Sequence, residues 1–252
     1  MASFLEVREL SKSFGNLRAL DGVTFDAEAK KVHILIGPNG SGKTTLINAI
    51  SGFYKADSGT VIFDGKDITG LPPFKAYRLG LARTFQIPNL FWKLTVLENV
   101  LVAEKGNPGE SFRKSLFKRS WVKSEKDATE RALKLLELLG LSKVWDNTAI
   151  KLSGGQMKLL EMGRVLMSGA KLILLDEPIS GVNPTLAHEI FVRILKLRDD
   201  LGVTFLIVEH RLDIALSYVD TVTAMAFGKV VAAGKPELVM ADPKVIEAYL
   251  GA

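Results

Sequence analysis

The first stretch of this sequence that could do chemistry is rich in glycine and reads GPNGSGKT at residues 37–44. An apolar run at residues 32–36 precedes it, and helical periodicity follows from Lys43. Such a loop at a helix N-terminus holds phosphate groups with backbone amides, because glycine lets the backbone approach closely and turn sharply. Lys43 can reach the β- and γ-phosphates of a nucleotide, and the Thr44 hydroxyl can bind Mg²⁺. The predicted phosphate-binding residues are Gly37, Pro38, Asn39, Gly40, Ser41, Gly42, Lys43, Thr44 and Thr45.

Two adjacent carboxylates, Asp176 and Glu177, follow an apolar run at residues 172–175. Carboxylates at the carboxyl end of a buried parallel strand lie beside the ligand crevice of an α/β sheet. There Asp176 is predicted to hold Mg²⁺ through water, and Glu177 to polarise the attacking water as a general base. The alternative is a pair of acids that caps a helix before Pro178. The phosphate-binding stretch upstream favours the catalytic interpretation.

A third motif, LSGGQ at residues 152–156, lies between the other two. It precedes a helix expected over residues 156–167, and the N-terminus of such a helix carries a positive partial charge that can bind an anion. A short turn of small residues is unspecific by itself. The three motifs in this order and at these spacings are specific.

Apolar runs and turn residues predict the elements that position these motifs. Short strands are expected at residues 4–10 and 23–36, and helical character from about residue 88 to 151. The other expected elements are a helix from residue 43 to about 51, a hairpin at 59–66, strands at 172–175 and 203–208 around a helix at 185–199, a hairpin at 221–233, and short helices from Pro236 and Pro243. Strand and helix alternate at both ends of the chain, which predicts an α/β fold with a largely parallel sheet and a helical insertion.

Composition limits the class of protein. The 252 residues are 47% hydrophobic, which is enough for a large α/β domain. The absence of cysteine excludes disulfides, thiolate zinc sites and thiol catalysis, and the 3 histidines have no metal-ligand spacing. No apolar run approaches the roughly 18 residues of a membrane span, and charges occupy the N-terminus where a signal peptide is apolar. A cytoplasmic protein is expected, with any membrane role acting through a partner.

The net charge of +5 is small for a nucleic-acid-binding protein and mostly dispersed, so no nucleic-acid partner is predicted. One basic stretch is an exception, and it contains Arg113, Lys114, Lys118, Arg119, Lys123 and Lys126, interleaved with Phe112, Phe117 and Trp121. Such a stretch could contact phospholipid head groups or RNA. A solvated helix face with a few aromatic residues facing the core is the favoured interpretation.

The three motifs together resemble the ATP-binding subunit of ABC transporters, and the resemblance covers essentially the whole chain. It implies a P-loop NTPase fold with a RecA-like, largely parallel sheet core, an N-terminal antiparallel β subdomain and an inserted α-helical subdomain. The core would comprise residues 1–86 and 156–252, and the helical subdomain residues 87–155, within a single ABC ATPase domain. ATP and Mg²⁺ are the implied cofactors, and ATP hydrolysis is the implied reaction.

The resemblance also assigns smaller sites. Gln86 matches the glutamine that contacts Mg²⁺ and the attacking water, and His210 matches the switch histidine that contacts the γ-phosphate. Phe14 stands where an aromatic residue stacks on adenine, with a core phenylalanine as the alternative. The implied catalytic residues are Lys43, Gln86, Glu177 and His210, and the implied metal-binding residues are Thr44, Gln86 and Asp176. Asn183 replaces the aspartate often found after the catalytic glutamate, so this position carries no charge.

In this family the LSGGQ loop binds the γ-phosphate held by another subunit, and Ser153, Gly155 and Gln156 would form that half-site. One chain would then hold two half-sites and no complete site. A second, homologous ATPase subunit is therefore an implied partner. ATP would join the two subunits and hydrolysis would separate them, which converts chemistry into movement.

Within the family, residues 83–100, the extra segment of about 104–130, and residues 187–189 and 209–213 resemble the LivG type of branched-chain amino-acid importers. Permease subunits are then the implied partners, and the location would be peripheral, on the cytoplasmic face of the plasma (inner) membrane. A permease helix would dock in a groove lined by Ile87, Pro88, Leu90, Phe91 and Trp92.

Two alternatives to this subfamily stay open. One is the ATPase of a urea, amide or other amino-acid importer, because those sequences look similar. The other is a soluble ABC ATPase that acts on DNA, ribosomes or iron–sulfur assembly, although a single cassette without strong basic charge disfavours it. The resemblance implies that the transported substrate does not touch this subunit.

Overall fold

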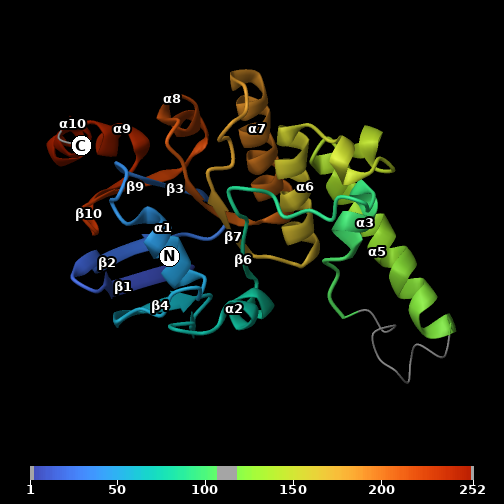
Figure 1. Cartoon of the computed structure of the whole chain (residues 1–252), viewed down its shortest axis with the longest axis horizontal. Coiled ribbons are helices and arrows are strands. Elements are labelled where there is room, and N and C mark those ends of the chain that lie inside the picture. Colours follow the sequence, from blue (N-terminus) through green and yellow to red (C-terminus); the bar gives the residue numbers. More distant parts are fainter. Residues whose placement is uncertain (1–2, 107–117, 251–252) are drawn as a thin grey trace. The chain divides into compact units, whose positions relative to one another are not determined.

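The structure, a computed structural model, describes residues 3–106 and 118–250 (Figure 1). In the second range, side chains are described from residue 122 onward. Most of the predicted basic stretch, residues 112–121, lies outside the residues whose side chains are described. The chain forms two compact units. The first comprises residues 1–86, 171–180 and 187–252, and the second residues 87–170 and 181–186. The subdomains predicted from the sequence have the same boundary after Gln86 as these two units. Their second boundary is predicted after residue 155, and this division stays a prediction.

The N-terminal part of the first unit is a four-stranded antiparallel sheet in the order β2-β1-β4-β5. Its strands are β1 (Leu5–Phe14), β2 (Leu17–Ala27), β4 (Ser58–Phe63) and β5 (Lys66–Asp67). The predicted hairpin around Asp64-Gly65 is confirmed by the pairing of β4 with β5. This sheet is the antiparallel β subdomain that the resemblance implied.

A six-stranded sheet forms the other layer of the first unit, in the order β10-β9-β3-β8-β7-β6. Its strands are β3 (Val32–Ile36), β6 (Leu81–Arg83), β7 (Leu172–Asp176), β8 (Thr204–Val208), β9 (Thr221–Ala226) and β10 (Lys229–Gly234). All neighbouring pairs are parallel except β9 with β10, which form a hairpin. The prediction of an α/β fold with a largely parallel sheet is therefore confirmed.

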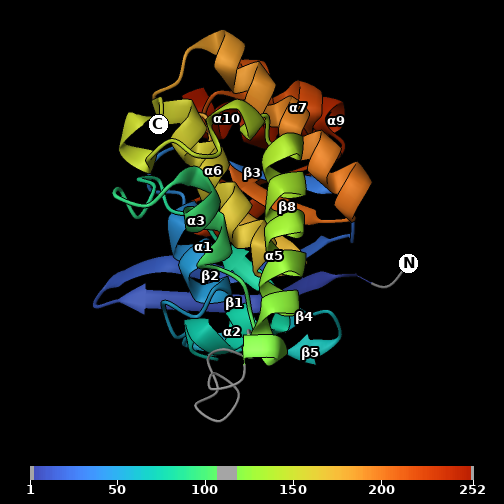
Figure 2. The same cartoon turned by 90° about the vertical axis from the view of Figure 1, so that its right-hand side faces the viewer.

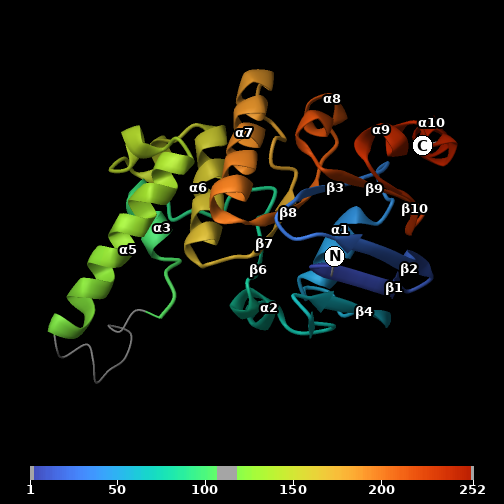
Figure 3. The same ribbon diagram turned by 180° about the vertical axis from the view of Figure 1, so that it is seen from behind.

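The core of the first unit lies between the two sheets and around α1 (Lys43–Ile50). Side chains of α1 such as Leu46 and Ile47 are fully buried against apolar residues of both sheets. The strands of the two sheets present apolar side chains on the faces that pack against α1. Helices α7 (Pro184–Leu201) and α8 (Leu212–Ala215) lie on the opposite side of the six-stranded sheet from α1 (Figures 1 and 3). The remaining helices of this unit are α2 (Pro73–Leu79), α9 (Pro236–Met240), α10 (Pro243–Leu250) and the short 3-10 turn Leu216–Tyr218.

The second unit is helical, as predicted for residues 88–151. In it α3 (Val96–Leu101), α5 (Lys118–Leu138) and α6 (Gly154–Met167) pack against one another (Figure 2), with 3-10 turns at Ser142–Val144 and Ala149–Lys151. Its buried apolar residues include Val100, Leu136 and Leu160, which lie on the facing sides of the three helices. Helix α3 begins at a capping box in which the Thr95 side chain accepts from the Glu98 amide at 3.1 Å.

The strand predictions near the N-terminus were too short in one place and too long in another. Strand β1 continues to Phe14 and β2 starts at Leu17, so most of residues 11–22 is extended. The polar composition of this segment gives no alternating apolar pattern, so the sequence did not indicate strands here. The strands pair with each other in a hairpin whose register shifts interrupt the alternation. The predicted strand 23–36 is two strands separated by residues 28–31.

Candidate functional site

Tertiary contacts require the glycines of the loop between β3 and α1. Gly37 has φ +145, and a Cβ there would lie 2.1 Å from the Met225 carbonyl oxygen of β9. Gly42 has φ +101, and its Cβ would lie 2.5 Å from the Ala19 carbonyl oxygen. Because any side chain would clash with backbone, only glycine lets the loop follow this path. The loop amides therefore stand at the N-terminus of α1 as the phosphate-binding motif predicts.

Lys43 lies over this loop and is almost completely buried. Its Nζ donates to the carbonyl oxygens of Gly37 and Pro38 at 2.8 and 2.9 Å. Burial lowers the pKa of the Lys43 ammonium, while the nearby charges of Glu177 and Asp176 raise it. The ammonium is thus a buried cation within the electrostatic influence of two carboxylates.

The two carboxylates at the end of β7 are held in different ways. Asp176 accepts from the Arg83 guanidinium at 2.8 Å, and the same Arg83 donates to Asn48 of α1. Glu177 has φ +50, an unusual backbone conformation for a residue with a side chain, and its amide donates to the Val208 carbonyl oxygen at 2.9 Å. Strained backbone of this kind persists where surrounding contacts fix it, which is common at functional sites.

The Glu177 side chain is the meeting point of the predicted catalytic residues. Gln86 Nε2 donates to Glu177 Oε2 at 2.9 Å, and His210 Nε2 lies 3.3 Å from Glu177 Oε1. These residues follow β6, β7 and β8 in the chain, and these strands are neighbours in the sheet. The carboxyl ends of the parallel strands therefore bring together side chains that are far apart in the sequence.

One pocket of about 500 Å³ is lined by the phosphate loop, Glu177 and His210, whereas Gln86 and Asp176 do not line it. The predicted residues that line it are Phe14, Asn39, Gly40, Gly42, Lys43, Thr44, Thr45, Glu177 and His210. Phe14 is 43% exposed, so the alternative of a core phenylalanine does not hold. A cradle of amides with a buried lysine, a carboxylate and an imidazole at one side and an aromatic ring at another is suited to bind and hydrolyse a nucleoside triphosphate.

Comparison with known proteins agrees with this geometry. A family model described as ABC transporter matches residues 20–180. The chain belongs to the ABC transporter family. A probable branched-chain amino acid transport ATP-binding protein LivG from Archaeoglobus fulgidus is 52% identical over 98% of this chain and 95% of its own length. A second family model, described as branched-chain amino acid ATP-binding cassette transporter, matches residues 229–252.

Solved structures of ABC proteins have the same fold. The ADP conformation of an ATP-binding cassette of an ABC transporter has a TM-score of 0.85 at 47% identity, with 100% of both chains covered. A dimeric post-hydrolysis state of another ATP-binding cassette, bound to ADP and Pi, has a TM-score of 0.73 at 25% identity over 92% of this chain and 98% of its own. The P-loop NTPase fold class is confirmed, and the protein is a nucleotide-binding ABC ATPase.

The sequence of this ABC ATPase did not indicate that some further residues line the nucleotide pocket, namely Leu17, Arg18, Ala19, Phe227 and Gly228. The turn at residues 227–228 lies beside the phosphate loop because the Gly228 amide donates to the Ser41 carbonyl oxygen at 3.1 Å. Glycine at the hairpin turn was visible in the sequence. Its place beside the nucleotide pocket follows from the pairing of β9 with β3 and was not visible.

The C-terminal helix also reaches the phosphate loop of this ABC ATPase. Burial raises the pKa of the Tyr249 phenol in α10, and a hydrogen bond with the backbone of Gly37 opposes that rise. The predicted short helix from Pro243 thus has a contact that no local pattern indicated.

The LSGGQ loop belongs to the second unit, and none of its residues lines the pocket. Ser153 caps α6, since its side chain accepts from the Gln156 amide at 3.4 Å and the Gln156 side chain accepts from the Ser153 amide at 3.0 Å. A Cβ on Gly155 would lie 2.2 Å from Cδ2 of Leu186, whereas one on Gly154 would meet nothing within 4 Å. The Asn183 side chain accepts from the Leu186 amide at 2.9 Å, which places this uncharged residue at the start of α7. The three predicted half-site residues therefore share one helix N-terminus.

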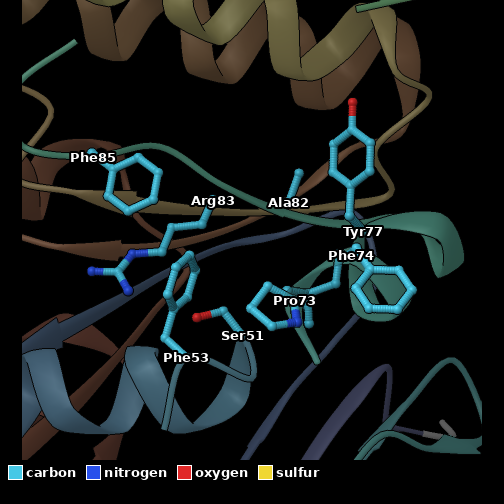
Figure 4. A pocket seen from close by; sticks show the side chains of 9 residues that line it. Ser51, Phe53, Pro73, Phe74, Tyr77, Ala82, Arg83 and Phe85 are labelled. Carbon is cyan, nitrogen blue, oxygen red and sulfur yellow. The ribbon is translucent and has the colours of Figure 1, made fainter. Parts of the chain in front are cut away.

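A second cavity of about 230 Å³ lies in the first unit and has an apolar, aromatic lining (Figure 4). Phe53 and Phe85 form an edge-to-face pair with centroids 5.7 Å apart, and the Arg83 guanidinium lies over both rings. Phe74 is 56% exposed on another wall. This cavity is connected to the predicted metal-binding and catalytic residues through the chain, because Arg83 binds Asp176 and Phe85 precedes Gln86.

Proposed function

We propose that this chain is the ATP-hydrolysing subunit of an importer for branched-chain amino acids. The observation that supports the chemistry is the convergence of Gln86 and His210 on Glu177 at one end of the phosphate-binding pocket. The observation that supports the transported substrate is the similarity over nearly the whole chain to a LivG protein of branched-chain amino acid transport.

In the proposed reaction, the loop amides and Lys43 hold the triphosphate while Glu177 accepts a proton from the attacking water. Lys43 neutralises charge on the β- and γ-phosphates, and its burial strengthens that interaction. His210 and Gln86 keep the Glu177 carboxylate oriented and contact the γ-phosphate side of the site. Phe14 stacks on the adenine ring at the open side of the pocket.

The donor set fits Mg²⁺ as the proposed metal. The Thr44 hydroxyl, the Asp176 carboxylate and the amide oxygen of Gln86 are hard oxygen donors, and Mg²⁺ is usually bound by one or two carboxylates together with substrate phosphates and water. The described residues contain no cluster of three or more histidine, cysteine or acidic side chains that could hold a metal alone. Held by Thr44, Asp176 and Gln86, the metal would supply positive charge that neutralises the phosphates during hydrolysis.

A second homologous ATPase subunit is the proposed partner of the LSGGQ loop. Ser153 and the first amides of α6 stand at a capped helix N-terminus, which suits an anion. None of them lines the phosphate-binding pocket of their own chain, so they would complete a site built on another subunit. The dimeric state of an ABC relative bound to ADP and Pi supports this arrangement.

The membrane partners are proposed to be permease subunits, which would hold this chain at the cytoplasmic face of the membrane. No helix among the described residues is long and apolar enough to cross a bilayer. The aromatic cavity lined by Phe53, Phe74 and Phe85 offers an apolar surface for a short permease helix. Phe91 and Trp92, predicted to line the docking groove, are 47% and 44% exposed in the second unit, whereas Leu90 is buried.

Reconstitution tests the proposed function. The chain would be placed in proteoliposomes with candidate permease subunits and a candidate binding protein, and ATP-dependent uptake of labelled leucine, urea and small amides would be compared. Uptake of leucine that stops with Glu177→Gln is expected. Uptake of urea or amides alone would assign the alternative substrate class, and binding to ribosomes or DNA instead of permeases would overturn the transport function.

The two surfaces proposed for permease docking, the aromatic cavity and the predicted groove, can be tested separately from the chemistry. Phe74→Ala, and separately Phe91→Ser or Trp92→Ser, should uncouple uptake while the ATPase activity of the isolated subunit stays within a few-fold, because these rings do not line the nucleotide pocket. Transport that survives all three changes in folded protein would place the permease elsewhere.

A further inference from the structure

Glu209 follows β8 directly and is only 2% exposed, yet it is absent from the residues that line either pocket. Its Oε1 accepts from the Ile179 amide at 2.9 Å. Its Oε2 accepts from the His210 amide at 3.0 Å and from the Arg211 amide at 3.4 Å. One buried carboxylate therefore binds two separate loops through three backbone N–H groups.

These two loops carry the residues that meet in the pocket. Ile179 belongs to the turn that begins at Glu177, which is closed by a hydrogen bond of 3.1 Å from the Ser180 amide to the Glu177 carbonyl oxygen. His210 belongs to the other loop, and its imidazole lies 3.3 Å from the Glu177 carboxylate. The backbone positions on both sides of the Glu177–His210 contact are thus fixed by the same side chain.

The three N–H donors around Glu209 match the accepting oxygens of a carboxylate. Burial raises the pKa of Glu209, while the three backbone hydrogen bonds oppose the rise and the charge of Glu177 adds to it. A carboxylate presents two accepting oxygens. A glutamine of the same size would present one accepting oxygen and an NH₂ group, which would face the N–H donors of one of the loops.

We propose that Glu209 is a positioning residue for ATP hydrolysis, which holds the Glu177 turn and the His210 loop at the separation that their contact needs. This inference rests on the proposed roles of Glu177 and His210. Glu209 acts through these two residues and does not touch the nucleotide.

The test is Glu209→Gln in the full-length chain, assayed for ATP hydrolysis and nucleotide binding. We expect kcat to fall by about 10²-fold, the scale for a displacement of about 1 Å at a reacting group, with KM and ATP affinity within about two-fold of the parent. Amide hydrogen exchange should rise in the peptides that contain Ile179 and His210. Glu189→Gln on the exposed part of α7 is the charge-matched control and should change none of these values.

A double variant separates positioning from a merely structural role. If Glu209 acts through His210, the fall in kcat caused by Glu209→Gln should largely disappear in a His210→Ala background, because residues that work as a unit are not additive. An equal fall in both backgrounds, or a loss of nucleotide affinity with kcat unchanged, would overturn the proposal. If Glu209→Gln does not fold, Glu209→Asp enters the same comparison with the same two outcomes.

The single variant His210→Ala distinguishes this inference from the proposed function. An unchanged kcat in that variant would remove His210 from the mechanism, whatever Glu209 does. A large loss in His210→Ala together with normal activity in Glu209→Gln would remove the positioning role alone.

Discussion

Two glycine-rich loops in this protein each lead into a helix, and they differ in why they contain glycine. In the phosphate loop, Gly37 and Gly42 have positive φ and face carbonyl oxygens of other strands. In the LSGGQ loop, Gly155 is already helical and is needed because Leu186 fills the space beside it. The first loop is shaped by backbone contacts and the second by side-chain packing.

The loops also differ in the chemistry around them. The phosphate loop shares its pocket with the Lys43 ammonium, the Glu177 carboxylate and the His210 imidazole. The LSGGQ loop supplies the Ser153 hydroxyl, the Gln156 amide and the helix amides. Both loops stand at a helix N-terminus, which suits an anion, but among the described residues the first shares its pocket with a carboxylate and an imidazole, so changes in the two loops should fail in different ways.

The largest effect should come from Glu177→Gln, because the amide keeps the shape of the side chain and cannot accept the proton. Turnover should fall by about 10² to 10⁴ with ATP binding retained, and a trapped dimer should be visible by size exclusion. Glu237→Gln, an exposed acid on α9, is the control. Hydrolysis near the parental rate would remove Glu177 as the general base.

Lys43→Ala should weaken ATP binding by about 10- to 10²-fold, since a charge-assisted hydrogen bond of roughly 1.5–3 kcal/mol is lost. Equilibrium titration with a fluorescent ATP analogue measures this on the single chain. Lys66→Ala, on the exposed strand β5, should bind like the parent. Equal binding by both variants would contradict the assignment of the phosphate loop.

Ser153→Arg should leave ATP binding by the single chain intact and abolish the ATP-dependent dimer, because the larger side chain fills the space proposed for the γ-phosphate of the partner. Nucleotide titration and light scattering on one sample test both properties, with Ser217→Arg at an exposed turn as the control. Loss of binding and dimerisation together would mean that the two loops act within one chain.

Gly155→Ala should lower the free energy of unfolding by about 1–3 kcal/mol, because the added methyl overlaps Leu186. Gly154→Ala is the matched control, since nothing lies within 4 Å of its Cβ. Denaturant unfolding followed by circular dichroism compares them. Equal stability of the two variants would contradict the packing reason for the second glycine.

Phe14→Ala should have the smallest effect, a loss of about 0.5–1.5 kcal/mol of ATP binding, the scale of an aromatic stacking contact. The binding of inorganic triphosphate should not change, because it has no base to stack. Calorimetric titration with both ligands checks this. A parallel loss for triphosphate would show that Phe14 supports the phosphate loop instead of the base.

Local patterns predicted many of the elements and the chemical groups of this protein, but not β6 or α2. The apolar strand β3, the glycines and the start of α1 at Lys43 are adjacent in the chain, so the phosphate loop could be predicted from neighbouring residues. The same holds for the hairpins with Asp64-Gly65 and Gly228, and for the helices that open at Pro236 and Pro243. Turn residues and hydrophobic periodicity act over a few neighbouring residues, so they can be recognised in the sequence before the fold is known.

Only the tertiary structure decided which of these groups meet. The order β3-β8-β7-β6 in the sheet brings Gln86, Glu177 and His210 within hydrogen-bonding distance, although more than a hundred residues separate the first from the last. The same order lets Glu209 bind the backbone of both loops, and the pairing of β9 with β3 puts the turn at Gly228 against Ser41. Such contacts depend on strand order and burial, which no spacing along the chain encodes, because parallel strands align residues across the sheet and not along the sequence.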